Sequence, residues 1–367
     1  MTNPVHALDR YYLGLTLLVT IGYQLLGFAI AWTFQFDKIT DFTGGSNFFL
    51  LAILTLCIGN TFYARNIVAS ALVMVWACRI AGFLLFRVLK MGKDARFDDI
   101  RSSFWKFLGE WAVAGYIRPS STVSSLTFLS SSPSLAFWIA QILWVWTVSL
   151  PVTILNSPSV SDPSLGGSNP AFGTSRDIAG IVLWAVGFLI ETIADAQKYR
   201  AKATGTVPKG YPMNTGLWAW SRHPPYFGEM LCWWGVWILC ISPATNGSLS
   251  SGAKAALYGS VVSPLFTFLI LMFGSGVPTG EKPVAERYFL MSNGPPSHLQ
   301  PFPAQEGAWD RYKNYLNETS ILIPIPPPLY RPLPTILKRT LLMDFPFYQF
   351  REEKEGKAAI GNATRDN

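Results

Sequence analysis

Seven apolar runs, each close to the length that crosses a lipid bilayer, constrain this chain more than any other feature of its sequence. A transmembrane helix needs about 20 mostly apolar residues. Charged residues make up only 14% of the chain, whereas soluble domains contain roughly 25%. The sequence therefore predicts an all-α fold, a polytopic membrane helix bundle of about seven transmembrane helices. The expected spans lie near residues 11–36, 46–63, 67–89, 134–156, 177–198, 227–244 and 254–276.

The basic residues of the loops are divided unevenly between the two sides of such a bundle. The loops after the third and fifth runs and the C-terminal tail carry many Lys and Arg, whereas the other side has only Arg10, Arg65, Arg176 and Lys254. The positive-inside rule therefore predicts a lumenal N-terminus and a cytosolic C-terminus. The net charge of +7 belongs to these loops, and no nucleic-acid-binding motif accompanies it, so we expect no nucleic acid partner.

The chain is expected to divide into a transmembrane helical domain, residues 1–280, and a cytosolic C-terminal tail, residues 281–367. The tail contains a Pro-rich segment at 323–334, which is expected to be extended. A Ser-rich segment at 119–134 is typical of a flexible loop. The four cysteines form no CxxC pair and no Cys/His metal spacing, so no metal site is expected.

The densest polar cluster of the chain is SRHPPYFGE, residues 221–229, at the start of the sixth run. Pro224 and Pro225 suit the first turn of a helix. The helix that begins here would point its N-terminal amides at the cytosol, and helix N-termini bind phosphates and carboxylates. Arg222 would add a bidentate anion-binding fork and His223 a hydrogen-bond donor. The motif therefore predicts an anion-binding pocket.

Aromatic and acidic side chains accompany this predicted pocket. Trp218 and Trp220 offer flat surfaces on which a base could stack, Tyr226 falls in the first turn of the helix, and Glu229 lies one turn further. This combination favours a nucleotide-containing cofactor. The alternative is that the Arg-His pair merely flanks a span and contacts lipid headgroups.

Ionisable residues also occur inside the predicted spans. Arg79 lies in the third run, and Glu191 and Asp195 lie four positions apart in the fifth. A charged side chain inside a span costs at least about 2.5–3.5 kcal/mol on insertion scales, so each needs a partner or a function. Arg79 and Glu191 are expected either to form a structural ion-pair network or to line a polar pocket that opens to the cytosol.

The SRHPPYFGE motif closely resembles the signature of the DUF1295 family, which is related to the C-terminal domain of steroid 5-alpha-reductases. Four further blocks resemble the family in the same order, so the resemblance covers roughly residues 65–290. These blocks are VWACRIAGFLLFRVLKMGKDARFDDIR (75–101), FWIAQILWVWTVSLPV (137–152), GIVLWAVGFLIETIADAQK (180–198) and SGVPTGEKPVAERY (275–288).

The resemblance implies a steroid-reductase-like bundle in the endoplasmic reticulum that acts in lipid metabolism. The implied activity is an oxidoreductase, the NADPH-dependent reduction of a CH–CH group in a lipid or sterol-like substrate. Tyr226 and Glu229 are candidate catalytic proton donors. NADPH is favoured over NADH because its extra phosphate suits Arg and Lys. The residues expected at the cofactor are Asp195, Lys198, Arg200, Lys202, Trp218, Ser221, Arg222, His223, Tyr226, Glu229, Arg287 and Tyr288.

Two other classes of function stay open. Isoprenylcysteine and phospholipid methyltransferases, which use S-adenosylmethionine, share an Arg-His-Pro-x-Tyr motif at the start of a span. They pair it with two adjacent Glu residues, whereas the late acids here, Glu281 and Glu286, are separated. The other class is a non-catalytic lipid-binding membrane protein. It is favoured by Pro225, which stands where the DUF1295 family usually has Asn and whose side chain cannot hydrogen-bond a nicotinamide amide.

Overall fold

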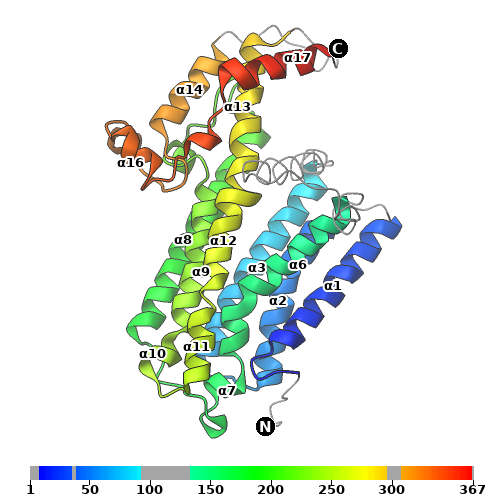
Figure 1. Cartoon of the computed structure of the whole chain (residues 1–367), viewed down its shortest axis with the longest axis vertical. Helices are drawn as coiled ribbons and strands as arrows, with labels where there is room; N and C mark the ends of the chain where they lie inside the picture. The colour runs from blue at the N-terminus through cyan, green and yellow to red at the C-terminus, as the bar shows by residue number, and fades with distance from the viewer. Residues whose placement is uncertain (1–7, 35–38, 92–132, 296–306, 366–367) are drawn as a thin grey trace, which may run out of the picture. The chain divides into compact units, whose positions relative to one another are not determined.

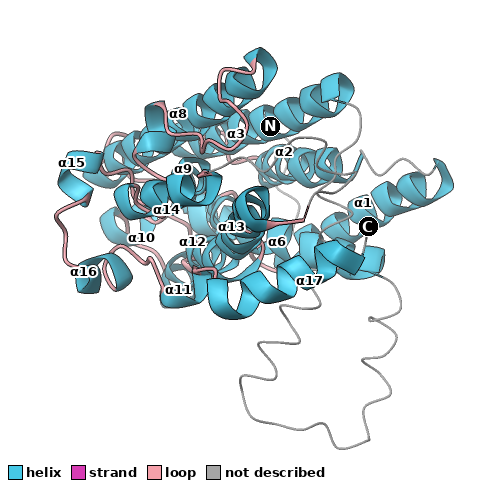
Figure 2. Cartoon of the chain, turned by 90° about the horizontal axis from the view of Figure 1, so that it is seen from above, coloured by secondary structure: helices cyan, strands magenta, loops and turns pink. Residues whose placement is uncertain are grey.

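The computed structural model describes residues 8–34, 39–91, 133–295 and 307–365. These residues form helices joined by loops and contain no β-strand (Figure 2), and their one isolated β-bridge joins Ser221 to Ser320. The predicted all-α class is therefore confirmed. The loop at 92–101 and most of the Ser-rich segment at 119–134 lie outside the described residues.

Seven candidate membrane spans occur within the described part of the chain, as the sequence predicts. The fifth helix, α8, continues to Thr204, beyond the apolar run that marks it. The seventh crossing is not a single helix, because a π-helical turn, η3, interrupts it. The elements that form the spans are α1 (Leu13–Phe34), α2 (Ile39–Gly59), α3 (Ala64–Met91), α6 (Pro133–Leu155), α8 (Ser175–Thr204), α9 (Pro224–Cys240) with α10 (Ser242–Asn246), and α11 (Ser251–Gly259), α12 (Val262–Leu269), η3 (Ile270–Gly274) and α13 (Val277–Asn293).

The chain forms two compact units. The first contains residues 1–184 and 233–267, and the second contains residues 185–232 and 268–367. Three helices, α8, α9 and α12, contribute residues to both units. The short elements α7 (Pro158–Ser161) and η1 (Pro163–Leu165) belong to the first unit.

Helices α1, α2, α3 and α6 pack together in the first unit (Figure 1), and its core is aromatic, with Trp233 of α9 contributing. Phe48 is fully buried, and its ring centroid lies 5.3 Å from that of Trp76, 4.9 Å from that of Trp144 and 5.3 Å from that of Trp233. The pairs with Trp76 and Trp144 pack edge to face, and such pairs stabilise a core beyond the area that they bury. This unit also contains a buried ion pair, in which Arg65 Nε lies 2.8 Å from Asp177 Oδ1.

Pairs of glycines let α8 and α9 approach closely in each unit. In the first unit, a Cβ added to Gly180 would lie only 2.6 Å from the carbonyl oxygen of Gly235. In the second unit, a Cβ added to Gly228 would lie 2.6 Å from the carbonyl oxygen of Gly187. Small residues at helix contacts are typical of membrane bundles. There, close backbone packing holds helices together, because no hydrophobic driving force acts between helices in lipid.

The C-terminal part of the chain is folded into the second unit. Helix α13 passes through residue 280 without a break, and the expected cytosolic position of residues 281–367 stays a prediction. Met272, Ile321 and Tyr348 share one buried cluster, and Phe289 and Trp309 share another. The remaining elements are η2 (Gly216–Ala219), α14 (Ala308–Glu318), α15 (Pro327–Tyr330) inside the Pro-rich segment, α16 (Thr335–Arg339), η4 (Pro346–Tyr348), η5 (Glu352–Gly356) and α17 (Lys357–Arg365).

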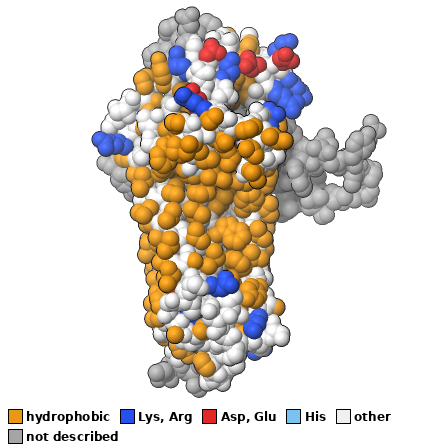
Figure 3. Space-filling view, turned by 90° about the vertical axis from the view of Figure 1, so that its left-hand side faces the viewer, with side chains coloured by type: hydrophobic (Ala, Val, Ile, Leu, Met, Phe, Trp, Pro, Cys, Tyr) orange, Lys and Arg blue, Asp and Glu red, His pale blue; other side chains and the backbone are white. Residues whose placement is uncertain are grey.

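Large apolar side chains are exposed along the predicted spans. On α8 alone, Val182, Leu189 and Ile193 are 54%, 56% and 46% exposed. Figure 3 shows a face on which hydrophobic side chains cover a broad area with few charges among them. Apolar exposure on this scale is unusual for soluble monomers, and it fits an integral membrane protein whose helices contact lipid.

Candidate functional site

The residues just before α9 are held by a segment of the C-terminal tail. The backbone N–H of Arg222 donates to the carbonyl oxygen of Ser320 at 2.8 Å, and Ser221 Oγ donates to the carbonyl oxygen of Leu322 at 2.7 Å. Ser221 and Ser320 are fully buried. Arg222 therefore lies at the N-terminal end of α9, as the sequence predicts, but a stretch of the tail covers it.

The guanidinium of Arg222 is clamped between two carboxylates. Nη1 lies 3.2 Å from Oε2 of Glu281 on α13, and Nη2 lies 2.8 Å from Oδ1 of Asp344, which follows α16. Arg222 is only 7% exposed. Burial disfavours its charged form, but the charges of Glu281 and Asp344 outweigh this and hold the pKa of Arg222 above its usual value. The cluster is thus a buried, charged network.

His223 is fixed from three directions. Its Nε2 lies 2.7 Å from Oε1 of Glu281, and its ring stacks on Tyr226 with centroids 5.1 Å apart and planes 6° from parallel. On its edge, a Cβ added to Gly280 would lie 2.8 Å from His223 Cε1, so any larger residue there would have to displace the ring. A carboxylate on one ring nitrogen sets the tautomer and leaves the other nitrogen for proton transfer.

Two polar atoms in this cluster have unused hydrogen-bonding capacity. Arg222 Nε and Ser320 Oγ are buried, and neither has a hydrogen-bond partner among the described residues. An unsatisfied buried donor costs about 1–3 kcal/mol. The backbones of the two residues are hydrogen-bonded to each other, and a ligand oxygen that reached either side-chain atom would find a donor without a partner.

Buried tyrosines surround the charged network. Tyr315 donates its hydroxyl to the carbonyl oxygen of Trp218 at 2.8 Å, and Tyr330 donates to Oδ2 of Asp344 at 3.3 Å. Burial raises the pKa of Tyr312, Tyr315 and Tyr330 above its usual value. All three therefore stay protonated at neutral pH, and Tyr315 and Tyr330 act as donors.

Several residues expected at the cofactor are engaged elsewhere in the second unit. Trp218 is buried, donates Nε1–H to the carbonyl oxygen of Ala194 at 2.9 Å, and has Lys198 Nζ 4.5 Å from its ring centroid. Tyr288 stacks on Tyr312 at 4.5 Å and donates its hydroxyl to the carbonyl oxygen of Tyr211. The exposed Arg287 lies over the ring of Tyr288.

The basic residues at the end of α8 do not converge. Lys198, Arg200 and Lys202 are all exposed, but a helix of 3.6 residues per turn directs alternate residues to nearly opposite faces. Lys198 is turned to Trp218, whereas Arg200 and Lys202 lie on nearly opposite faces. A common phosphate site for these three residues stays a prediction.

The acids of α8 and α9 lie where the two helices meet. Glu191 is 3% exposed, and a Cβ added to Gly228 would lie 2.9 Å from Glu191 Cβ. Asp195 and Glu229 are partly buried, and both have interaction partners. Arg79 lies on α3 in the first unit and Glu191 in the second, so the expected pocket between them also stays a prediction.

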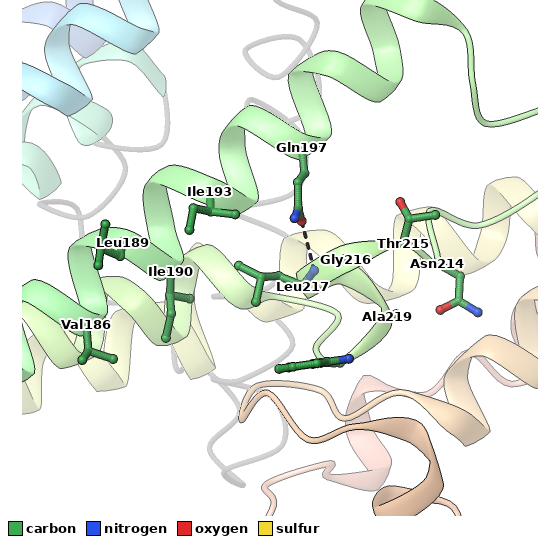
Figure 4. Close-up of a pocket in the computed structure, with 11 residues that line it drawn as sticks. Val186, Leu189, Ile190, Ile193, Gln197, Asn214, Thr215, Gly216, Leu217 and Ala219 are labelled. Atoms are coloured by element: carbon green, nitrogen blue, oxygen red, sulfur yellow. Dashed lines mark hydrogen bonds between the residues drawn. The ribbon is translucent and has the colours of Figure 1, made fainter.

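A groove of about 520 Å³ lies along α8 in the second unit. Figure 4 shows its apolar residues following one another along the helix, with amide and hydroxyl side chains at the other end. It is lined by Val186, Leu189, Ile190, Ile193, Gln197, Asn214, Thr215, Gly216, Leu217, Ala219 and Trp220. In the part of the chain that the structure describes, no group of three or more His, Cys, Asp or Glu residues is arranged to hold a metal ion.

The sequence did not single out the partners of Arg222. Glu281 lies in one of the blocks that resemble the family and is one of the two late acids compared with the methyltransferases, but neither feature connects it to Arg222. Asp344 and Ser320 are far from Arg222 in the sequence and lie in a region without a motif. No local pattern could have connected them.

Comparison with known families gives one match. The sequence model of the family described as "Protein of unknown function (DUF1295)" matches residues 27–118 and 120–291. Comparisons with curated proteins and with solved structures give no match. The matched range includes Arg222, His223 and Glu281, whereas Ser320 and Asp344 lie beyond it.

Proposed function

The chain belongs to the DUF1295 family, which is known as steroid 5-alpha-reductase-like, and from this premise we propose that it is an integral membrane oxidoreductase. The proposed reaction is the NADPH-dependent reduction of a carbon–carbon double bond in a lipid or sterol-like molecule. Loop charges support a lumenal N-terminus and a cytosolic C-terminus, and the resemblance to steroid reductases supports the endoplasmic reticulum as the compartment.

The observation that carries this proposal is that the buried Nε–H of Arg222 and the buried hydroxyl of Ser320 are both unused, in two residues joined by a backbone hydrogen bond. A buried guanidinium is the side chain best suited to phosphate oxygens, and a neighbouring hydroxyl adds a second donor. These two residues would hold a phosphate of the cofactor. NADPH supplies a hydride to the substrate when it is bound.

The protein must also supply a proton to the second carbon of the double bond. His223 suits this role because Glu281 holds its Nε2 and leaves Nδ1 for proton transfer. Tyr226, stacked on His223, and Glu229 remain the other candidates. Because this cluster is largely buried, bulk water would be excluded from the place where the proton is transferred.

The test is a thermal-shift titration of the detergent-purified full chain with NADPH, NADH and S-adenosylmethionine. A ligand that binds only the folded state adds about 2.7 kcal/mol of stability at a hundredfold excess over its Kd. We expect NADPH alone to raise the melting temperature. Stabilisation by S-adenosylmethionine would replace this proposal with methyl transfer. No shift with any of the three would favour a lipid-binding protein without a cofactor.

A further inference from the structure

The groove along α8 has a polarity gradient along its length. Four apolar side chains from α8 form one part, and Gln197, Asn214 and Thr215 form the other (Figure 4). Pockets that bind small molecules typically measure about 300–1,000 Å³ and are mostly apolar with a few polar groups. The groove falls within that range and suits a molecule with an apolar chain and a polar head.

The wall opposite α8 is built in advance of any ligand. Gln197 Oε1 accepts a hydrogen bond from the backbone N–H of Leu217 at 3.0 Å, and Trp218 Nε1 donates to the carbonyl oxygen of Ala194. Gly216 has φ +58°, and a Cβ there would collide with the Gln197 amide. Two hydrogen bonds and a required glycine therefore hold this loop against α8.

The length of the groove matches one leaflet of a bilayer. Val186 and Gln197 are separated by a rise of about 16 Å along an α-helix. Half of a hydrocarbon core is about 15 Å deep. Trp220 lines the groove and is 43% exposed, as expected for a Trp at the membrane interface.

The charges of α8 are distributed asymmetrically about the groove. Arg200, three residues beyond Gln197, continues the face that lines the groove, and it is exposed. Glu191, Asp195 and Lys202 fall on the opposite side of the helix, by the periodicity of 3.6 residues per turn. On this helix, the polar end of the groove therefore has a cation and no acid.

We propose that this groove is a binding site for one anionic phospholipid of the surrounding bilayer. An acyl chain would lie against Val186, Leu189 and Ile193, and the phosphate would lie beside the amides of Gln197 and Asn214. The additional anionic group of the headgroup, which phosphatidylcholine lacks, would meet Arg200. The site is separate from the Arg222 cluster, and the proposal does not depend on the reductase activity.

The experiment uses the full chain in nanodiscs of phosphatidylcholine with a minor fraction of phosphatidylserine. After mild transfer to detergent, native mass spectrometry counts the lipids that each chain retains. We expect one retained phosphatidylserine in the unaltered chain. Ile190→Trp, which fills the apolar part of the groove, should lower that retention roughly tenfold. Arg200→Gln should weaken the preference for phosphatidylserine roughly ten- to hundredfold, because a charge-assisted hydrogen bond is lost.

The matched control is Lys202→Gln, which removes a cation from the opposite side of the same helix. It should retain phosphatidylserine as the unaltered chain does. If the Arg200 and Lys202 variants lost phosphatidylserine equally, the retention would depend on the overall surface charge of the helix, and the proposal would be overturned. Equal retention of both phospholipids, or retention unaffected by Ile190→Trp, would overturn it as well. If one oleate displaced each retained phospholipid, the ligand of the groove would be a free fatty acid, and the phospholipid proposal would be overturned.

Discussion

Nε2 of His223 lies 2.7 Å from Oε1 of Glu281, and the other oxygen of the same carboxylate faces Arg222. Two adjacent residues at the start of α9 therefore share one acid from α13. Asp344 completes the clamp on the guanidinium. The same side chains therefore contribute both to the stability of the fold and to the proposed chemistry.

Glu281→Gln should destabilise the protein far more than Glu355→Gln. Removing one partner of a buried ion pair costs about 3–5 kcal/mol, and Glu281 faces both Arg222 and His223 in the interior. Glu355 pairs with Lys282 at 2.7 Å, but both side chains are substantially exposed, and such pairs contribute only about 0–1 kcal/mol. Melting temperatures of the two variants in one detergent check this. Similar losses would mean that the clamp contributes little.

Ser320→Ala should leave the stability of the ligand-free protein unchanged or raise it, because its buried hydroxyl has no partner to lose. It should weaken NADPH binding about three- to tenfold, the value of one neutral hydrogen bond. Ser149→Ala is the control, since Ser149 Oγ is also buried without a partner but lies in the first unit. Equal NADPH affinity in both variants would remove Ser320 from the cofactor site.

Gly187→Ala should destabilise the contact between α8 and α9. The added methyl group would meet the backbone of α9 at Gly228 and Cys232, and overpacking of this kind costs about 1–3 kcal/mol. Gly82→Ala provides the comparison, because nothing lies within 4 Å of a Cβ at that helical position. That variant should be neutral or up to about 1 kcal/mol more stable. Unfolding midpoints measure both, and a neutral Gly187→Ala would contradict the close approach.

Gly216→Ala should cost more than Gly205→Ala. Both glycines have a left-handed backbone, with φ +58° and +62°, so each substitution adds about 1–2 kcal/mol of strain. Only at Gly216 does the new methyl group also collide with Gln197, whereas Gly205 has open space around it. The difference in melting temperature between the variants isolates that collision. If the two fell equally, the loop would not be pressed against α8.

In a protease-protection assay on intact, right-side-out microsomes, a peptide tag at the C-terminus should be cleaved by added protease. A tag at the N-terminus should be protected. The reason is the excess of Lys and Arg in the loops assigned to the cytosol. Detergent should make both tags accessible, which controls for tags that are simply buried. Protection of the C-terminal tag in intact vesicles would reverse the proposed orientation.

The spans and the entry of α9 could be predicted because both are local properties of the sequence. Twenty apolar residues mark a helix wherever they occur, and Pro224 and Pro225 mark a first turn. The apolar run predicts that this span ends at residue 198, whereas α8 continues to Thr204. Lys198 and Lys202 end the apolar run, but Lys and Arg are good helix formers, so the helix continues after the hydrophobicity stops.

The partners of Arg222 could not be predicted, because they are set by the tertiary fold. Asp344 lies 122 positions away, and nothing in its neighbours distinguishes it from the other carboxylates of the tail. The motif suggested an open anion site, whereas the structure shows that protein carboxylates already take two of the three guanidinium nitrogens. Ser320 was equally hidden, since its importance comes from a backbone hydrogen bond to Arg222.

The clamp on Arg222 also has a consequence for the order of events during synthesis. Asp344 leaves the ribosome 122 residues after Arg222, which is roughly 6–24 s at the usual rates of translation. The start of α9 is therefore made and inserted well before its second counter-charge exists. The nascent chain can complete the clamp on Arg222 only after Asp344 has been made, so the segment from Ser320 to Asp344 acts as a closing step in the maturation of a site that begins much earlier.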